Sequence, residues 1–204
     1  MRPLRPFALL VAALLTACAS ARPSPEGPPA HLSIHGTIQP RMIDQLAFLY
    51  PPDRLPGRVV VDLASGGGDF DTALRLARWL EQVPRSTAVV TRECDSACLI
   101  IFTAARERLV DRSAVFGAHA PTCALQDLPG LPCRLFWEPQ ARDELHDRVA
   151  AASPRWAEYL DTREPPAFER RGADLVRVTG DQLIAFGAAT PLTRGALSAA
   201  LEAN

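Results

Sequence analysis

The sequence predicts an α/β domain in which a parallel β-sheet, made of repeated strand–turn–helix units, is covered by helices. Two observations support this fold class. Short runs of the chain are rich in β-branched and other apolar residues, as in buried strands. Between these runs lie longer stretches whose apolar residues recur at helical spacing. Strands that alternate with helices in this way are typical of parallel sheets with helices packed on them. The predicted domain covers residues 31–204, a length sufficient for one hydrophobic core.

The first half of the domain is expected to contain two strand–helix units. A strand at 32–38 is followed by a helix at 41–50, which the consecutive prolines Pro51 and Pro52 end. The Val- and Leu-rich run at 59–63 is a buried strand by composition, and a helix follows at 69–83. This helix has an apolar face formed by Ala73, Leu76, Ala77, Leu80 and Val83.

The second half continues the alternation. The expected elements are a strand at 87–91, a helix at 96–106, a strand at 114–118, helices at 137–152 and 154–160, a short strand at 175–178 and a helix at 179–186.

The formal net charge of the chain is −1, so no basic surface for nucleic acid is expected.

The N-terminus predicts export. Arg2 and Arg5 precede an apolar stretch at 7–15 that is too short to span a bilayer but typical of a signal peptide. The stretch ends in Leu-Thr-Ala-Cys, which resembles a bacterial lipoprotein box and implies cleavage before a lipidated Cys18. The alternative is ordinary secretory cleavage after a small residue such as Ala21, with Cys18 lost.

These alternatives place the chain on the periplasmic side of a bacterial cell envelope. In the lipoprotein alternative, residues 1–17 are the signal peptide and the N-terminal lipid binds the membrane. Residues 18–30 are rich in proline and are expected to form an extended tether. The other alternative is a soluble periplasmic protein.

Four cysteines remain after Cys18: Cys94, Cys98, Cys123 and Cys133. An even number in an exported chain favours disulfides, although four cysteines allow three pairings. A local Cys94–Cys98 bridge requires residue 94 to be extended, because the two Cα atoms must come within about 7 Å, while a Cys123–Cys133 bridge would close a loop rich in proline. A redox site is an alternative. The C-x3-C spacing without a second close pair disfavours zinc, and no other metal or cofactor is expected.

Three short motifs follow predicted strands and could act together. They are Ser-Gly-Gly-Gly-Asp at 65–69, Cys-Asp-Ser-Ala-Cys at 94–98 and Gly-Ala-His-Ala-Pro at 117–121. A serine nucleophile needs a neighbouring base, and acyl transfer also needs amide donors for the developing oxyanion. Ser96, His119 and the amides of Gly68 and Ala97 would supply these groups. The alternative is purely structural, with the glycines forming an ordinary turn and Ser96 capping a helix.

The distribution of basic residues narrows the choice of base. Only His119, of the four histidines, ends an apolar strand next to a possible site. The chain contains no lysine, and its 22 formal cationic residues are all arginine. Because arginine does not act as a base at neutral pH, a Ser-Lys dyad is excluded.

Taken together over residues 32–190, the motifs resemble the Clp protease proteolytic subunit and its periplasmic relatives in the Clp/crotonase superfamily. The resemblance implies that Gly68 gives an oxyanion-hole amide, Ser96 is the nucleophile and His119 is the base. It also implies an aspartate about fifty residues after the histidine. Asp174 and Asp161 are the candidates, while counting back from Gly187 leads to Leu175.

Two function classes are expected from this resemblance. The first is a membrane-tethered serine peptidase or hydrolase that acts on a peptide or protein substrate. The second is a non-catalytic Clp-fold protein with a binding or assembly role in the cell envelope, because fold does not by itself determine function. The family forms rings through the segment that follows the histidine. A homo-oligomer is therefore possible, although the predicted cysteine loop stands at the beginning of that segment.

Overall fold

The computed structural model describes residues 30–51, 55–122, 138–172 and 174–202 of the chain. The strands are β1 (Ala30–His35), β2 (Arg58–Ser65), β3 (Arg85–Asp95), β4 (Glu107–Val110), β5 (Val115–Ala118), β6 (Val176–Thr179) and β7 (Thr190–Pro191). The helices are α1 (Arg41–Leu49), α2 (Phe70–Gln82), α3 (Cys98–Ala104), α4 (Glu138–Ala152), α5 (Pro154–Asp161), α6 (Gly180–Phe186) and α7 (Arg194–Glu202), with a short 3-10 helix at Ala167–Glu169.

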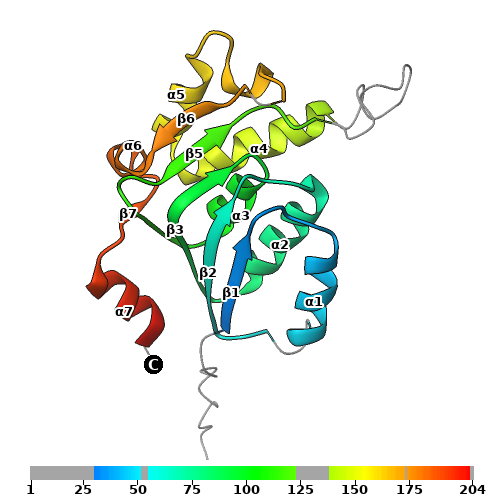
Figure 1. Cartoon of the computed structure of the whole chain (residues 1–204), viewed down its shortest axis with the longest axis vertical. Helices are drawn as coiled ribbons and strands as arrows, with labels where there is room; N and C mark the ends of the chain where they lie inside the picture. The colour runs from blue at the N-terminus through cyan, green and yellow to red at the C-terminus, as the bar shows by residue number, and fades with distance from the viewer. Residues whose placement is uncertain (1–29, 52–54, 123–137, 173, 203–204) are drawn as a thin grey trace, which may run out of the picture.

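One mostly parallel sheet joins these strands, and the long strand β3 organises it (Figure 1). The first half of β3 pairs with β4 at residues 87–90, while its last residues pair with β5 at 93–95. Strand β2 runs along the other side of β3, β1 lies beyond β2 and β7 beyond β4. Of the strands in the described residues, only β6 is antiparallel, and it pairs with β5. The sheet therefore divides at β3, and the β5–β6 pair belongs to the carboxyl end of that strand.

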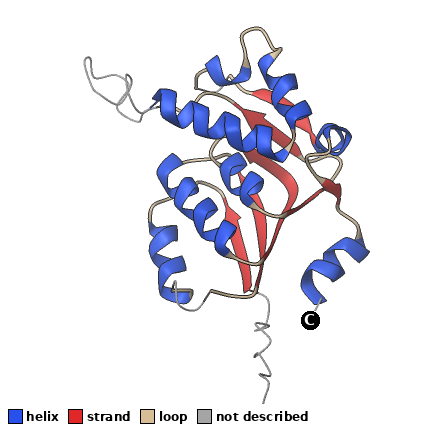
Figure 2. Ribbon diagram, turned by 180° about the vertical axis from the view of Figure 1, so that it is seen from behind, coloured by secondary structure: helices blue, strands red, loops and turns tan. Residues whose placement is uncertain are grey.

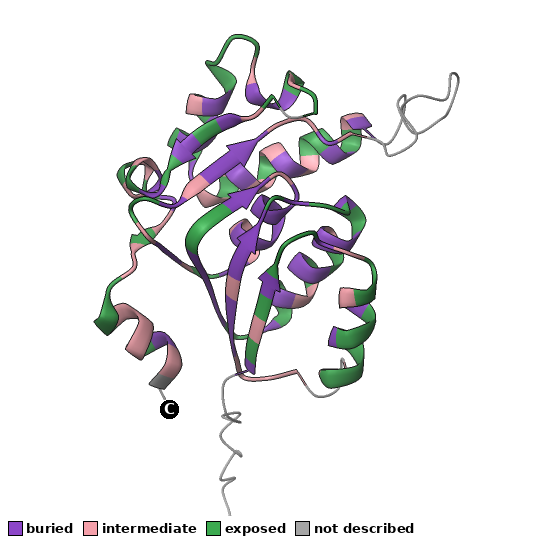
Figure 3. Ribbon diagram, viewed as in Figure 1, coloured by how far each residue is buried: buried purple, intermediate pink, exposed green. Residues whose placement is uncertain are grey.

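Helices α1 to α5 cover one face of the sheet (Figure 2). The central strands are buried because helices pack on them, and the Val and Leu residues of β2 are almost inaccessible to solvent (Figure 3). On the opposite face, α7 covers a smaller apolar cluster in which Ala200 packs with Val60, Val89 and Leu109. Two apolar layers of unequal size thus hold the sheet in place.

An aromatic cluster fixes the position of α3. The Phe102 ring lies 5.0 Å from the Phe116 ring and 6.4 Å from the Trp156 ring, centroid to centroid. These three side chains come from α3, β5 and α5, and each is less than 2 % exposed. Because α3 directly follows the turn after β3, the cluster also positions that turn.

The α/β class and the mostly parallel sheet covered by helices are confirmed. Strand β3 extends to Asp95, beyond the predicted end at 91, and α3 begins only at Cys98. Strands β4 and β7 and helix α7 were not predicted. Among the described residues, no helix combines the length and apolarity required to span a bilayer. The signal peptide, Cys18, the tether up to residue 29 and the pair Cys123 and Cys133 lie outside the described residues.

Candidate active site

The turn after β3 holds Ser96 in an unusual backbone conformation. Ser96 has a φ of 56°, in the left-handed region that residues with a side chain rarely adopt. Its amide donates a 2.7 Å hydrogen bond to the carbonyl of Gly117 on the neighbouring strand β5, and its own carbonyl accepts from Leu99. The conformation is therefore held by β5 on one side and by α3 on the other.

Ser96 does not cap the helix that follows it. The N-cap residue of α3 is Ala97, and no side chain makes a capping hydrogen bond there. The hydroxyl of Ser96 instead lies 2.7 Å from Nε2 of His119. The purely structural interpretation of Ser96 as a helix cap is thus wrong.

A disulfide joins Cys94 to Cys98 across this turn, with the Cα atoms 5.2 Å apart. Cys94 is still part of β3, which satisfies the requirement that residue 94 be extended. Both cysteines are fully buried. The predicted local bridge is confirmed, and it closes a small ring around Ser96.

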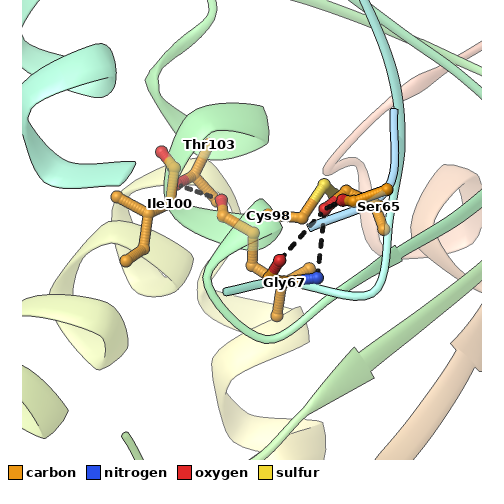
Figure 4. The surroundings of a disulfide bond; sticks show 8 residues. Ser65, Gly67, Cys98, Ile100 and Thr103 are labelled. Atoms are coloured by element: carbon orange, nitrogen blue, oxygen red, sulfur yellow. Dashed lines mark hydrogen bonds between the residues drawn. A yellow bond between two sulfur atoms is a disulfide. The ribbon is translucent and has the colours of Figure 1, made fainter. Parts of the chain in front are cut away.

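The glycine turn after β2 lies against the Ser96 turn and beside the disulfide (Figure 4). Ser65 is fully buried, and its hydroxyl donates to the carbonyl of Gly36 and accepts from the amide of Gly67. A Cβ at Gly67 would come within 2.8 Å of the Ser96 Cβ and 3.2 Å of the Ala97 nitrogen. The turn can approach the serine this closely only because residue 67 is glycine.

Gly68 has a φ of 143° and lies against the loop that follows β1. A Cβ at this position would stand only 2.4 Å from the carbonyl oxygen of Ile38, so no other residue fits. In the described part of the chain, neither the amide of Gly68 nor that of Ala97 donates a hydrogen bond. The structure therefore leaves free the two donors that the sequence predicts for an oxyanion hole.

His119 follows β5 and is half-buried. Burial lowers the pKa of its imidazole, while the Ala120 backbone and the charge of Asp95 act in the opposite direction. A lowered pKa keeps the ring neutral near pH 7, so Nε2 can accept a proton from Ser96. The next residue is fixed as well, because the amide of Ala120 donates to the carbonyl of Arg170 at 2.9 Å.

The two aspartates suggested as partners of His119 are bound elsewhere. The carboxylate of Asp174 is largely exposed and pairs with Arg170 at 2.9 Å. The carboxylate of Asp161 lies 3.0 Å from Nε2 of His146. Within the described ranges neither carboxylate forms a hydrogen bond with His119, whose Nδ1 is buried without an acceptor. The geometry therefore does not support either aspartate as the third group.

The sequence interpretation missed three residues beside the site. Asp95 is only 5 % exposed, and its Oδ2 lies 3.1 Å from Nη1 of Arg177 on β6. Burial raises the pKa of the Asp95 carboxyl, and Arg177 opposes this shift. Gly117 lies between them on β5. The sequence contains a signal for these residues: a glycine lies inside a predicted strand, and an acidic residue directly precedes the serine.

A cavity of about 260 Å³ lies beside the residues that follow His119 in the chain. Its lining begins with Ala120 and Pro121 and includes the ion pair between Glu138 and Arg171. Phe168 forms an apolar part of the wall. The cavity thus has charged and apolar parts, and its lining includes the two residues that follow His119 but neither His119 nor Ser96.

Comparison with known proteins supports the fold. No family model matches the chain, and no curated protein matches it. A solved structure does match: a ClpP1 mutant from Listeria monocytogenes superposes with a TM-score of 0.63 over 82% of this chain and 94% of that chain, at 14% sequence identity. The chain therefore has a ClpP-like fold, as the motifs predicted.

Proposed function

We propose that this protein is an exported serine hydrolase, and specifically a peptidase, with Ser96 as nucleophile and His119 as general base. The observation that carries the proposal is the 2.7 Å contact between Ser96 Oγ and His119 Nε2, formed by a serine in a left-handed turn. A general base must lie within hydrogen-bond reach of the proton it takes, and a neutral imidazole meets this need. Backbone outliers held by their surroundings also cluster at functional sites.

The reaction follows from these positions. As Ser96 Oγ attacks the substrate carbonyl, its proton passes to Nε2, and the oxyanion forms next to the amides of Gly68 and Ala97. The imidazolium of His119 then gives its proton to the leaving group, which leaves an acyl group on Ser96. Water activated by the same imidazole hydrolyses the ester and restores the serine.

The finer parts of the proposal rest on the resemblance to the Clp protease subunit and on the N-terminal sequence. A peptide or protein substrate and assembly into a homo-oligomer follow from the resemblance. Attachment to the periplasmic face of a membrane through a lipid on Cys18 follows from the lipoprotein-like signal.

A fluorophosphonate probe, which reacts with activated serines, tests the nucleophile. We expect the wild type to be labelled and Ser96→Ala not to be labelled, while Ser33→Ala, which changes an exposed serine of β1, keeps the wild-type rate. Equal labelling of the wild type and Ser96→Ala would exclude Ser96 as the nucleophile.

One observation favours a second function. Among the described residues, Nδ1 of His119 has no hydrogen-bond acceptor, so none of them makes the hydrogen bond that orients a catalytic imidazole. A non-catalytic Clp-fold protein that binds a partner in the cell envelope would have no need of such a group. Failure of the wild type to react with the probe, in folded and disulfide-bonded protein, would favour this alternative.

A further inference from the structure

Three neighbouring strands bring Asp95, Gly117 and Arg177 into one row. Asp95 on β3 pairs in register with Gly117 on β5, and Gly117 pairs in turn with Arg177 on β6. Residues that pair across strands project to the same face of a sheet. The Asp95 carboxylate and the Arg177 guanidinium meet on this face, across the glycine.

Gly117 leaves the space that the carboxylate fills. A Cβ at residue 117 would stand 2.6 Å from Oδ1 of Asp95 and 2.8 Å from its Cγ. Any side chain here would displace the carboxylate, so the position of Asp95 depends on glycine at this position.

His119 comes two residues after Gly117 and directly after the end of β5. The charge of Asp95 acts on its imidazole, so the two side chains lie within electrostatic range of each other. Within the described part of the chain, each of these side chains has one buried atom without a hydrogen-bond partner, Nδ1 of His119 and Oδ1 of Asp95. One is the ring nitrogen left over after Nε2 contacts Ser96, and the other is the oxygen left over after Oδ2 contacts Arg177.

We propose, building on the function above, that Asp95 is the acidic partner of His119, with Oδ1 accepting from Nδ1–H while Arg177 holds Oδ2. Asp95 is then a positioning residue, since it acts on the substrate only through the histidine. It fixes the tautomer in which Nε2 is free to take the serine proton. It stays ionised and balances the positive charge that the ring gains when Ser96 loses its proton.

The charges around the pair agree with this role. The Asp95 charge raises the pKa of His119 against the effect of burial. Burial is the largest influence on Asp95 and raises its pKa, with a smaller contribution from the charge of Glu93, whereas Arg177 and the backbone of Gly117 lower it. Counting back from Gly187 aligns Leu175 with the expected aspartate of the Clp family. The Cδ1 atom of Leu175 lies only 3.1 Å from a Cβ built at Gly117. An apolar side chain thus stands just before β6, near a carboxylate that comes from β3.

The test measures the protonation of His119 directly by NMR and needs no activity. In the wild type, nitrogen shifts should place the proton of the neutral ring on Nδ1. Asp95→Asn should lower the pKa of His119 by about one unit, because a neighbouring negative charge stabilises the imidazolium. Asp174→Asn should leave this pKa unchanged. As a matched control, Asp181→Asn removes a surface Arg–Asp pair from α6 and should leave it unchanged too.

The same variants are then compared for the rate of fluorophosphonate labelling. We expect Asp95→Asn to slow labelling by on the order of 10²–10⁴-fold, and Asp181→Asn to keep the wild-type rate. An unchanged His119 pKa in Asp95→Asn, or a shift in Asp174→Asn instead, would overturn the assignment. Where Asp95→Asn does not fold, the wild-type tautomer decides, and a neutral ring with its proton on Nε2 refutes the proposal.

The two proposals fail in different ways. Wild-type protein that never reacts with the probe would contradict the hydrolase. The NMR titration would still show whether Asp95 acts on His119. If the probe labels the wild type but Asp95→Asn leaves the pKa of His119 unchanged, the hydrolase proposal remains and only the role of Asp95 is refuted.

Discussion

Replacing Gly117 by alanine should disturb the site through a single methyl group. The new Cβ would lie 2.6 Å from Oδ1 and 2.8 Å from Cγ of Asp95, closer than non-bonded heavy atoms approach, so the carboxylate must move. Its contact with Arg177 would then be lost or stretched. Overpacking of this kind typically costs about 1–3 kcal/mol. For a domain of this length that corresponds to a fall in melting temperature of roughly 2–12 °C.

Gly195→Ala is the matched control for Gly117→Ala. Gly195 lies in α7 with nothing within 4 Å of a built Cβ. Alanine there should be neutral or stabilise the fold by up to about 1 kcal/mol. Chemical denaturation gives the free energy of unfolding of both variants, and the fluorophosphonate probe gives the reactivity of Ser96. Gly117→Ala should be less stable and react more slowly. Stability and reactivity equal to those of Gly195→Ala would refute the placement of Asp95 over Gly117.

Three further predictions concern the disulfide, pH and the N-terminus. Mild reduction of Cys94–Cys98 should abolish probe labelling while the far-ultraviolet circular dichroism stays unchanged, because opening so short a loop costs only about 2 kcal/mol; labelling that survives verified reduction would contradict this. The labelling rate should rise with pH, with a midpoint below the usual histidine value of about 6.5. Since the unfolded chain binds a proton that folded His119 does not, the free energy of unfolding should also fall as the pH drops through that value. Cys18→Ser should give unlipidated or uncleaved protein, whereas an unmodified mature N-terminus beyond Cys18 in the wild type, seen by mass spectrometry, would indicate simple secretion.

The sequence predicted those parts of the fold that local patterns determine. The Val-rich run that becomes β2 and the apolar face of α2 are visible without any tertiary information. Strand β4 was missed because its four residues include Glu107 and Arg108. Arg108 is partly buried there because its guanidinium donates to the carbonyls of Ala105 and Ala188, the latter 80 residues away in the chain. No local pattern reports such a partner.

The residues of the candidate site also fall into two groups, those that local patterns predict and those that depend on tertiary structure. Ser96, His119 and the glycine turn each follow a strand, so their order along the chain was sufficient to predict that they meet. The role of Asp95 depends on β3 continuing to residue 95 and on its register with β5. Register is a tertiary property, and a search limited to aspartates after His119 leads to Asp174, whose carboxylate binds Arg170.

The backbone conformation of Ser96 distinguishes its turn from an ordinary helix cap. A serine that caps a helix has extended dihedrals, and its hydroxyl oxygen accepts a hydrogen bond from a helix amide. Ser96 has a positive φ instead, which costs on the order of 1–2 kcal/mol for a residue with a side chain. Its neighbours maintain that conformation through the Cys94–Cys98 bridge and the hydrogen bond to Gly117. Glycine at this position would relieve the strain, but it would also remove the hydroxyl that contacts His119. Strands β3 and β5 and helix α3 thus hold a strained serine against an imidazole, an arrangement that the proposed nucleophile requires and that the alternative binding role does not.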